Sequence, residues 1–157
     1  MEIKTGNGSG SPKLSDIKDN ITVDKEYCIK GEFIANGFNK NILRHDEGVI
    51  SMARGDYSAY GYTEEGYNSA GSQFFIMTKN TGTLNGLYAA FGKVIEGMDV
   101  VHNIENVEVE TRESNADGAD KPVNPPVIKS IRVETYGVDY GIPETIEPFN
   151  INQLFNQ

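Results

Sequence analysis

Tryptophan is absent from the sequence, and cysteine occurs once, at Cys28. A single cysteine excludes an internal disulfide and a multi-cysteine zinc site. Its place in the short apolar run Tyr27-Cys28-Ile29 predicts a buried, inert thiol. Histidine occurs only at His45 and His102, so we expect no histidine-based metal site. No apolar run approaches the length that spans a membrane, and the N-terminus carries no signal-peptide pattern.

Positive charge is also scarce, because 14 Lys and Arg face 23 Asp and Glu, for a net charge of −9. This imbalance disfavours nucleic acid and anionic membrane surfaces as partners. The acidic residues are spread through the loops and the C-terminal half, which predicts a solvated acidic surface. We expect a cytoplasmic location by default, which an export signal or lipid anchor encoded upstream of the given start would change.

Long hydrophobic segments are missing as well, although 157 residues are enough for one domain. Hydrophobic residues make up 38%, so the core must be concentrated in a few segments. Three short apolar runs stand between Gly- and Asn-rich loops: Val49-Ile50-Ser51-Met52, Phe74-Phe75-Ile76-Met77 and Ala89-Ala90-Phe91. Runs of this length between turn residues predict short buried strands. Side chains alternate along a strand, so one phenylalanine can fill the core while the other shares the opposite face with Gln73.

These runs belong to a series of motifs with a fixed order. The series consists of His45, Gly48-Val49-Ile50-Ser51-Met52-Ala53, Gly71-Ser72-Gln73-Phe74-Phe75-Ile76, Leu84-Asn85-Gly86 and Phe91-Gly92-Lys93-Val94-Ile95-Glu96-Gly97-Met98. In this order and spacing the motifs resemble the cyclophilin family of peptidyl-prolyl cis-trans isomerases. The resemblance extends from about Gly6 to Val133. The acidic, Tyr-rich insert and the tail resemble bacterial versions, those of anaerobic Gram-positive bacteria.

The resemblance implies a mainly β fold, a cyclophilin-like antiparallel β-barrel with one capping helix. Apolar residues spaced three and four apart predict that helix over Ile95 to Asn106. The alternating segment Val127 to Val133 corresponds to the closing strand of the family. We therefore expect a domain at 1–133 and an extension at 134–157. Pro143 and Pro148 exclude a long regular element from the extension, although one helical turn fits Ile151 to Phe155.

The resemblance also implies a groove that holds proline-containing peptides and unfolded proteins, without a cofactor or metal. Phe75 corresponds to the pocket floor, and Leu84 and Tyr88 to its wall. Gln73 corresponds to a residue that hydrogen-bonds beside the proline ring, so Gln73 and Phe75 are the implied catalytic residues. The implied substrate-binding residues are Ala53, Arg54, Phe75, Leu84 and Tyr88, with Ala53 and Arg54 acting through their backbones. On composition alone, simple core packing is the better explanation for Phe75 and Leu84, and the ordered motifs reverse this preference. The histidine matching His45 is structural in the family.

The chain departs from the family at its beginning. The match starts at the Gly-rich loop Gly6-Asn7-Gly8-Ser9-Gly10, and no Phe-x-Arg followed by Phe and Gln precedes it. We therefore expect the N-terminal part of the domain, with the catalytic arginine, to be missing. Arg54 follows a strand end on the opposite wall and is not assigned that role. Three hypotheses remain: an isomerase that assists protein folding, a weak Pro-peptide-binding module, and an assembly protein.

The Tyr-rich segment from Arg54 to Ala70 is longer than in relatives. Its tyrosines, Tyr57, Tyr60, Tyr62 and Tyr67, allow two interpretations. They form a self-packed surface loop, or they form a binding wall beside the groove.

Without the strands that pair with the Val127 to Val133 segment in relatives, we predict an open sheet edge there. Exposed edges pair with other chains. We therefore expect self-association, measured by sedimentation at several protein concentrations, or marginal stability. A monodisperse monomer with a sharp, cooperative melt and no dye-binding apolar surface would contradict this expectation.

Overall fold

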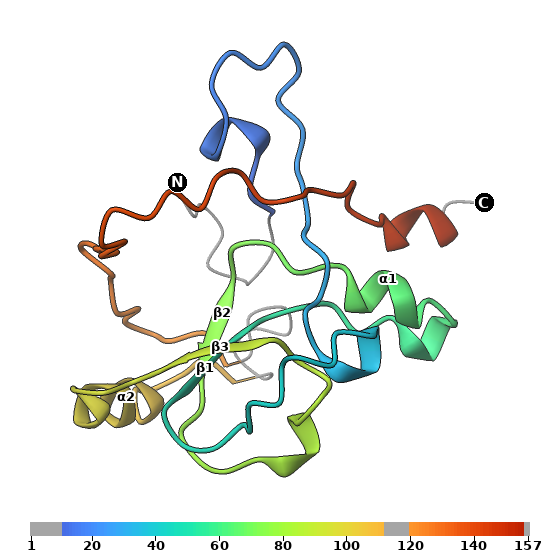
Figure 1. The fold of residues 1–157 in the computed structure, drawn as a ribbon. Helices are drawn as coiled ribbons and strands as arrows, with labels where there is room; N and C mark the ends of the chain where they lie inside the picture. Colours follow the sequence, from blue (N-terminus) through green and yellow to red (C-terminus); the bar gives the residue numbers. More distant parts are fainter. Residues whose placement is uncertain (1–10, 112–119, 156–157) are drawn as a thin grey trace.

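The computed structural model describes residues 11–111 and 120–155. The described residues form one sheet of three antiparallel strands in the order β2-β1-β3 (Figure 1). β1 comprises Val49–Met52, β2 comprises Phe74–Ile76 and β3 comprises Ala90–Lys93. The three strands coincide closely with the three short apolar runs, which confirms the sequence prediction of strands there. The fold is therefore mainly β with an antiparallel sheet and few helices, and the sheet of the described residues is open.

The central strand, β1, fixes the arrangement of the other two. Ser51 lies opposite Phe75 of β2 and opposite Ala90 of β3. The register with β3 shifts between Ile50 and Ser51, and an irregularity of this kind bends the strand and increases its twist. Val49 and Ser51 are buried, whereas the residues between and after them are half-buried. One face of β1 therefore points into the core.

The core is small. Val49, Met77 and Ala90 form its centre, and the half-buried Phe75 and Leu84 pack against them. A further set of buried apolar residues consists of Tyr27, Cys28, Phe33 and Ala70. Phe74 and Phe91 are exposed on the strands, so only one of the two adjacent phenylalanines of β2 contributes to the core.

The predicted helix is present as α2, Met98–Glu105. It begins three residues later than predicted, because the strand pairing continues to Val94, whose N–H donates to the Gly48 carbonyl at 2.8 Å. Gly97 then adopts a left-handed conformation with φ of 85° at the N-cap, which favours glycine. A second, short helix, α1, covers Thr63–Tyr67 within the Tyr-rich segment and was not predicted. None of the described helices is long and apolar enough to cross a membrane.

The predicted closing strand at Val127 to Val133 is wrong. Residues 127–133 have no regular secondary structure, and Val127, Ile131 and Val133 are all more than two-thirds exposed. The alternating pattern is compatible with a strand, but a strand exists only where a neighbour satisfies its backbone groups. No described strand lies beside this segment, so the open edges of the sheet belong to β2 and β3 instead. Barrel closure is therefore not part of the described fold.

The tail crosses the molecule and packs on the Tyr-rich segment, as the orange and red part of the ribbon shows (Figure 1). Ile146 exchanges two backbone hydrogen bonds of 2.9 Å with Cys28. Phe149 lies 4.8 Å from the Tyr62 ring and 5.6 Å from the Tyr57 ring, measured between centroids. These two tyrosines therefore pack against the tail. The predicted helical turn is present as the 3-10 helix Ile151–Leu154.

Cys28 is 4% exposed, which confirms the prediction of a buried thiol. Burial raises the pKa of this thiol, and the charge of Glu26 raises it further. A raised pKa keeps the sulfur protonated at neutral pH, so the thiol is a poor nucleophile.

We expect Phe149→Ala to lower the free energy of unfolding by about 1–2 kcal/mol, because the substitution removes two aromatic contacts and the apolar area they cover. Urea denaturation at constant m-value measures the loss. Tyr140→Ala is the matched control, because Tyr140 belongs to the same tail and is 77% exposed. Equal effects of the two substitutions would contradict the docking of the tail through Phe149.

Candidate functional site

The structure brings the implied pocket residues together on one wall. Phe75 stands in the middle of β2, and its ring lies 5.6 Å from the Tyr88 ring at an interplanar angle of 86°. Leu84 ends the 3-10 helix Gly82–Leu84 and packs, as Phe75 does, against the core centre. All three side chains are half-buried, so each combines a buried part with a part that faces solvent. We call Phe75, Leu84 and Tyr88 the aromatic wall.

His45 supports this wall from inside. Its ring stacks on Phe75 with 6.2 Å between centroids and 20° between planes, and lies 6.3 Å from the Tyr88 ring. Its Nε2 lies 3.1 Å from the Ser51 hydroxyl, and its Nδ1 lies 3.4 Å from Asn85 Oδ1. The backbone N–H of His45 donates to the same Asn85 oxygen at 2.7 Å. His45 is 1% exposed, which confirms the prediction of a structural, hydrogen-bonded histidine.

The Ser51, His45 and Asn85 side chains share the residue types of a hydrolytic triad, but they cannot act as one. Ser51 is fully buried, so no substrate carbonyl reaches its hydroxyl. Burial is the main reason that the pKa of His45 lies below its ordinary value, and the hydrogen bond to Asn85 opposes this shift. The imidazole is therefore neutral at pH 7 and acts as a packed support. Sequence reasoning found His45 but missed Asn85, although it belongs to the Leu84-Asn85-Gly86 motif.

The backbone contacts implied for Ala53 need refinement. The Ala53 N–H donates to the Gln73 carbonyl at 3.0 Å, which extends the pairing of β1 and β2 by one residue. This donor is therefore used within the sheet, and Ala53 can offer a substrate only its carbonyl. The Gln73 side chain is exposed at the start of β2, one residue before Phe74. It therefore lies on the sheet face that Phe75 shares, in a strand of alternating side chains.

The Arg54 side chain has contacts that sequence reasoning missed. Its guanidinium carbon lies 4.4 Å from the centroid of the Tyr88 ring and 4.9 Å from that of Tyr67. Its Nε donates to the Leu87 carbonyl at 3.0 Å, and its Nη1 donates to the Gly55 carbonyl at 2.8 Å. The side chain thus joins the Tyr-rich segment to the aromatic wall.

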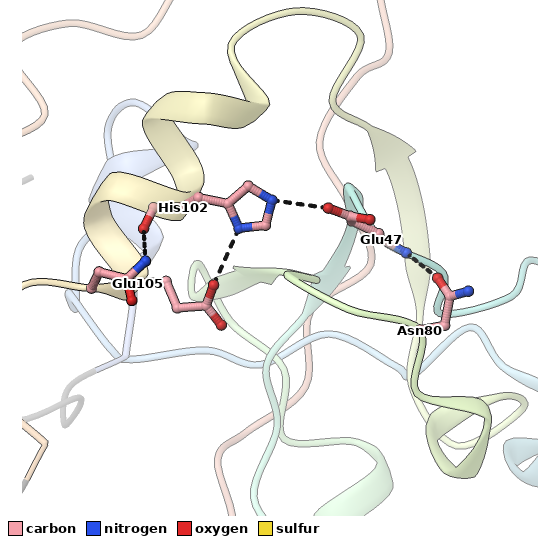
Figure 2. A network of polar contacts seen from close by, with 5 residues as sticks. Glu47, Asn80, His102 and Glu105 are labelled. Carbon is pink, nitrogen blue, oxygen red and sulfur yellow. Dashed lines mark hydrogen bonds and ion pairs between the residues drawn. The ribbon is translucent and has the colours of Figure 1, made fainter.

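A second polar network ties α2 to the loop before β1 (Figure 2). His102 Nε2 lies 2.9 Å from a Glu47 carboxylate oxygen, and its Nδ1 lies 3.2 Å from one of Glu105. The Glu47 N–H donates to Asn80 at 2.8 Å. Hydrogen bonds to Glu105 and then to Glu47 raise the pKa of His102 above its ordinary value. The two carboxylates approach opposite ring nitrogens, so they do not converge on a cation, and the described residues contain no metal-binding group of three.

A cavity of about 430 Å³ lies elsewhere, between residues 29–38 and the tail. Pro143 and Glu144 line it, and no member of the aromatic wall does. Its walls contain none of the residues that the motifs single out. We therefore assign the candidate site to the aromatic wall.

The chain resembles known proteins over the same stretch. The family model for cyclophilin type peptidyl-prolyl cis-trans isomerases matches residues 3–133. Peptidyl-prolyl cis-trans isomerase D of Saccharomyces cerevisiae is 44% identical over 71 residues, which cover 45% of this chain and 27% of that protein. The NK-tumor recognition proteins of Mus musculus and Homo sapiens are 38% identical over 84 residues, which cover 51% of this chain and 5% of theirs. The chain thus spans about a quarter or less of these relatives. The bacterial origin that the insert and tail suggest stays a prediction.

We predict opposite pH dependences for the two histidines. The pKa of His102 is raised from 6.5, so its contribution to stability is present below pH 6.5 and is lost as the pH rises through the raised pKa. The pKa of His45 is lowered from 6.5, so its contribution is present above pH 6.5 and is lost as the pH falls. Urea denaturation of His102→Gln should therefore show a larger loss at about pH 5.5 than at about pH 8.5. A loss that does not change with pH would show that His102 is not charged in the folded chain.

Proposed function

Because the chain belongs to the cyclophilin-type peptidyl-prolyl cis-trans isomerase family, we propose that it accelerates rotation of Xaa-Pro bonds, with the aromatic wall holding the proline ring. The observation that carries this proposal is the meeting of Phe75 and Tyr88 edge to face over the buried His45. Phe75 belongs to one motif of the family series, and Tyr88 lies between the two motifs that follow it. The two rings meet at 86° and form an apolar corner, which suits the compact, saturated pyrrolidine ring of proline.

The chemistry needs no cofactor. Rotation about the prolyl bond breaks amide resonance, and its barrier is about 20 kcal/mol. An apolar corner withdraws the amide from water, whose hydrogen bonds favour the planar, polar form. Anchors for the flanking peptide then hold one side of the bond while the other side turns. Within the aromatic wall, Phe75 forms the floor of the proline pocket, and Leu84 and Tyr88 form its side. Gln73 hydrogen-bonds to the peptide beside the proline ring. The Ala53 carbonyl and the Arg54 backbone align the peptide.

Full catalysis also needs a donor to the prolyl nitrogen, whose lone pair localises in the twisted state. In the family this donor is an arginine in a Phe-x-Arg segment, and the sequence contains no such segment. Arg54 is a poor substitute, because the Tyr67 and Tyr88 rings and the Leu87 and Gly55 carbonyls hold its guanidinium in place. We therefore assign the binding wall to a domain at 1–133, followed by an extension at 134–157, and we assign the donor role to no residue of this sequence.

The binding-module alternative predicts peptide capture without turnover by any form of the protein. The family membership supports the isomerase over this alternative. An assay of turnover in the presence of the donor segment separates the two.

We predict that Phe75→Leu lowers the isomerisation rate of an Ala-Pro peptide by about tenfold or more, because the floor of the corner is lost. The rate is measured by NMR exchange spectroscopy on the peptide.

Residues 1–157 alone should be slower, by about a hundredfold or more, than a chain that also carries the donor segment. The Phe75→Leu comparison is therefore made on both forms.

Phe74→Leu is the matched control. Phe74 is the neighbouring residue of β2, is 45% exposed and points to the other sheet face. Its substitution should leave the rate within about twofold. Equal losses of isomerisation rate in the two variants would contradict the assignment of the pocket floor to Phe75. Absence of turnover in the donor-containing form would favour the binding module.

A further inference from the structure

The Arg54 guanidinium lies between two tyrosine rings. Its central carbon lies 4.4 Å from the centroid of the Tyr88 ring and 4.9 Å from the centroid of the Tyr67 ring. Phe33 is a third ring, at 5.7 Å. Phe33 and Tyr67 contact each other edge to face, with 5.1 Å between centroids and 85° between planes. Arg54 therefore occupies an aromatic cage, one side of which is a member of the aromatic wall.

One hydrogen bond of the Arg54 side chain holds the backbone next to Tyr88. Nε donates to the carbonyl of Leu87, the residue directly before Tyr88, and Nη1 donates to the carbonyl of Gly55. Arg54 thus holds both the ring of Tyr88 and the backbone that carries it. A planar guanidinium can stack and donate at the same time, which the compact ammonium of lysine cannot do.

The neighbouring contacts show why this matters for the wall. Tyr88 meets Phe75 edge to face, and Phe75 is stacked on the buried His45. Phe75 is thus fixed from below, by packing and by its strand. Tyr88 follows the 3-10 helix Gly82–Leu84 and precedes β3, so no strand or helix fixes its backbone. His45 also contacts the Tyr88 ring, but the backbone support that β2 gives Phe75 is missing at Tyr88, and this is the side that Arg54 contacts.

We propose that Arg54 is a positioning residue that sets the angle of the Tyr88 ring and so keeps the proline corner open and rigid. This inference rests on the proposed function for its effect on peptide binding. Its effect on the Tyr88 ring is independent of that function. Arg54 does not donate to the prolyl nitrogen, because the cage and the two carbonyls hold the guanidinium.

Loss of the cage should act on binding more than on the turnover of bound peptide. A freely rotating Tyr88 ring must be ordered each time a proline ring enters, so the affinity falls. Cation–π contacts and hydrogen bonds of this kind correspond to about a threefold to tenfold change in the peptide dissociation constant. The rate for bound peptide should change by less than about twofold, since the Phe75 floor is unaffected.

The test uses Arg54→Met and Arg54→Lys, with Arg44→Met as the matched control. Arg44 is exposed, and its partner is Asp46. The first readout is the set of tyrosine ring signals in ¹H–¹³C NMR spectra without peptide. The second is the dissociation constant of an Ala-Pro peptide, obtained by NMR titration, beside the exchange rate of the bound peptide. Amide signals of Ile50 and Ile76 report whether the β1–β2 pairing is intact.

We expect both Arg54 variants to shift or broaden the Tyr88 signals and to weaken binding threefold to tenfold, while Arg44→Met changes neither. Lysine should fail to restore the Tyr88 signals, because its charge alone does not reproduce the planar guanidinium that stacks and donates at the same time. Weaker binding with unchanged Tyr88 signals would overturn the proposal, since Arg54 would then contact peptide directly. Unchanged binding and unchanged signals would overturn it as well.

Two outcomes separate this inference from the proposed function. If the unsubstituted chain binds no peptide, the proposed function fails, while a Tyr88 shift in Arg54→Met still supports the positioning role. If Arg54→Met does not fold, Arg54→Lys keeps the aliphatic stem and the charge and decides the question by the same readouts. A folded Arg54→Lys with native Tyr88 signals counts against the proposal.

Discussion

The hydrogen bond between Ser51 and His45 is the interaction on which the rest of the site depends. Ser51 is the point where β1 faces both neighbours, Phe75 on one edge and Ala90 on the other. Its hydroxyl and the His45 ring are both buried, so each group needs the other as a partner. Removing one would leave a buried polar atom without a partner, at a cost of about 1–3 kcal/mol. The ring held in this way stacks on Phe75, so the sheet register and the proposed pocket floor share one constraint.

The remainder of the described fold depends on few buried side chains. Apolar residues of α2 such as Val100 and Ile104 are about half exposed, and Phe91 is more than half exposed on β3. A chain with so little buried area gains little hydrophobic free energy per residue, so its backbone and aromatic contacts carry a larger share. This explains why the tail is held by a backbone exchange at Cys28 and by ring contacts at Phe149 instead of a continuous apolar face.

The sequence predicted what is local and periodic. Short apolar runs between turn residues predicted all three strands, because each strand begins within one residue of the run that forms it. Spacings of three and four predicted α2. The closing strand at 127–133 failed because a strand needs a neighbour, and no pattern within the segment reports whether one exists. The aromatic wall was implied by family motifs, and the structure places Phe75 and Tyr88 in contact.

The contacts of Arg54 and the docking of the tail were beyond prediction, since they join residues far apart in the sequence. Tyr62 and Phe149 are contact partners although no spacing relates them, and Arg54 reaches Leu87 from 33 positions away. Sequence reasoning could narrow the Tyr-rich segment to two interpretations, a surface loop or a wall. In the structure Tyr57 and Tyr62 pack on the tail, whereas Tyr67 faces Arg54.

The Tyr-rich segment therefore links the outside of the molecule to the site. Tyr57 and Tyr62 contact Phe149, and the last tyrosine, Tyr67, contacts the guanidinium that also contacts Tyr88. Rings and guanidinium groups lose little conformational freedom when they pack, because few torsions remain to be fixed. In a chain with a small core, such contacts fix side chains that burial alone leaves half-exposed. Contacts between planar groups thus hold the tail on the Tyr-rich segment at Phe149 and join that segment to Tyr88 through Arg54.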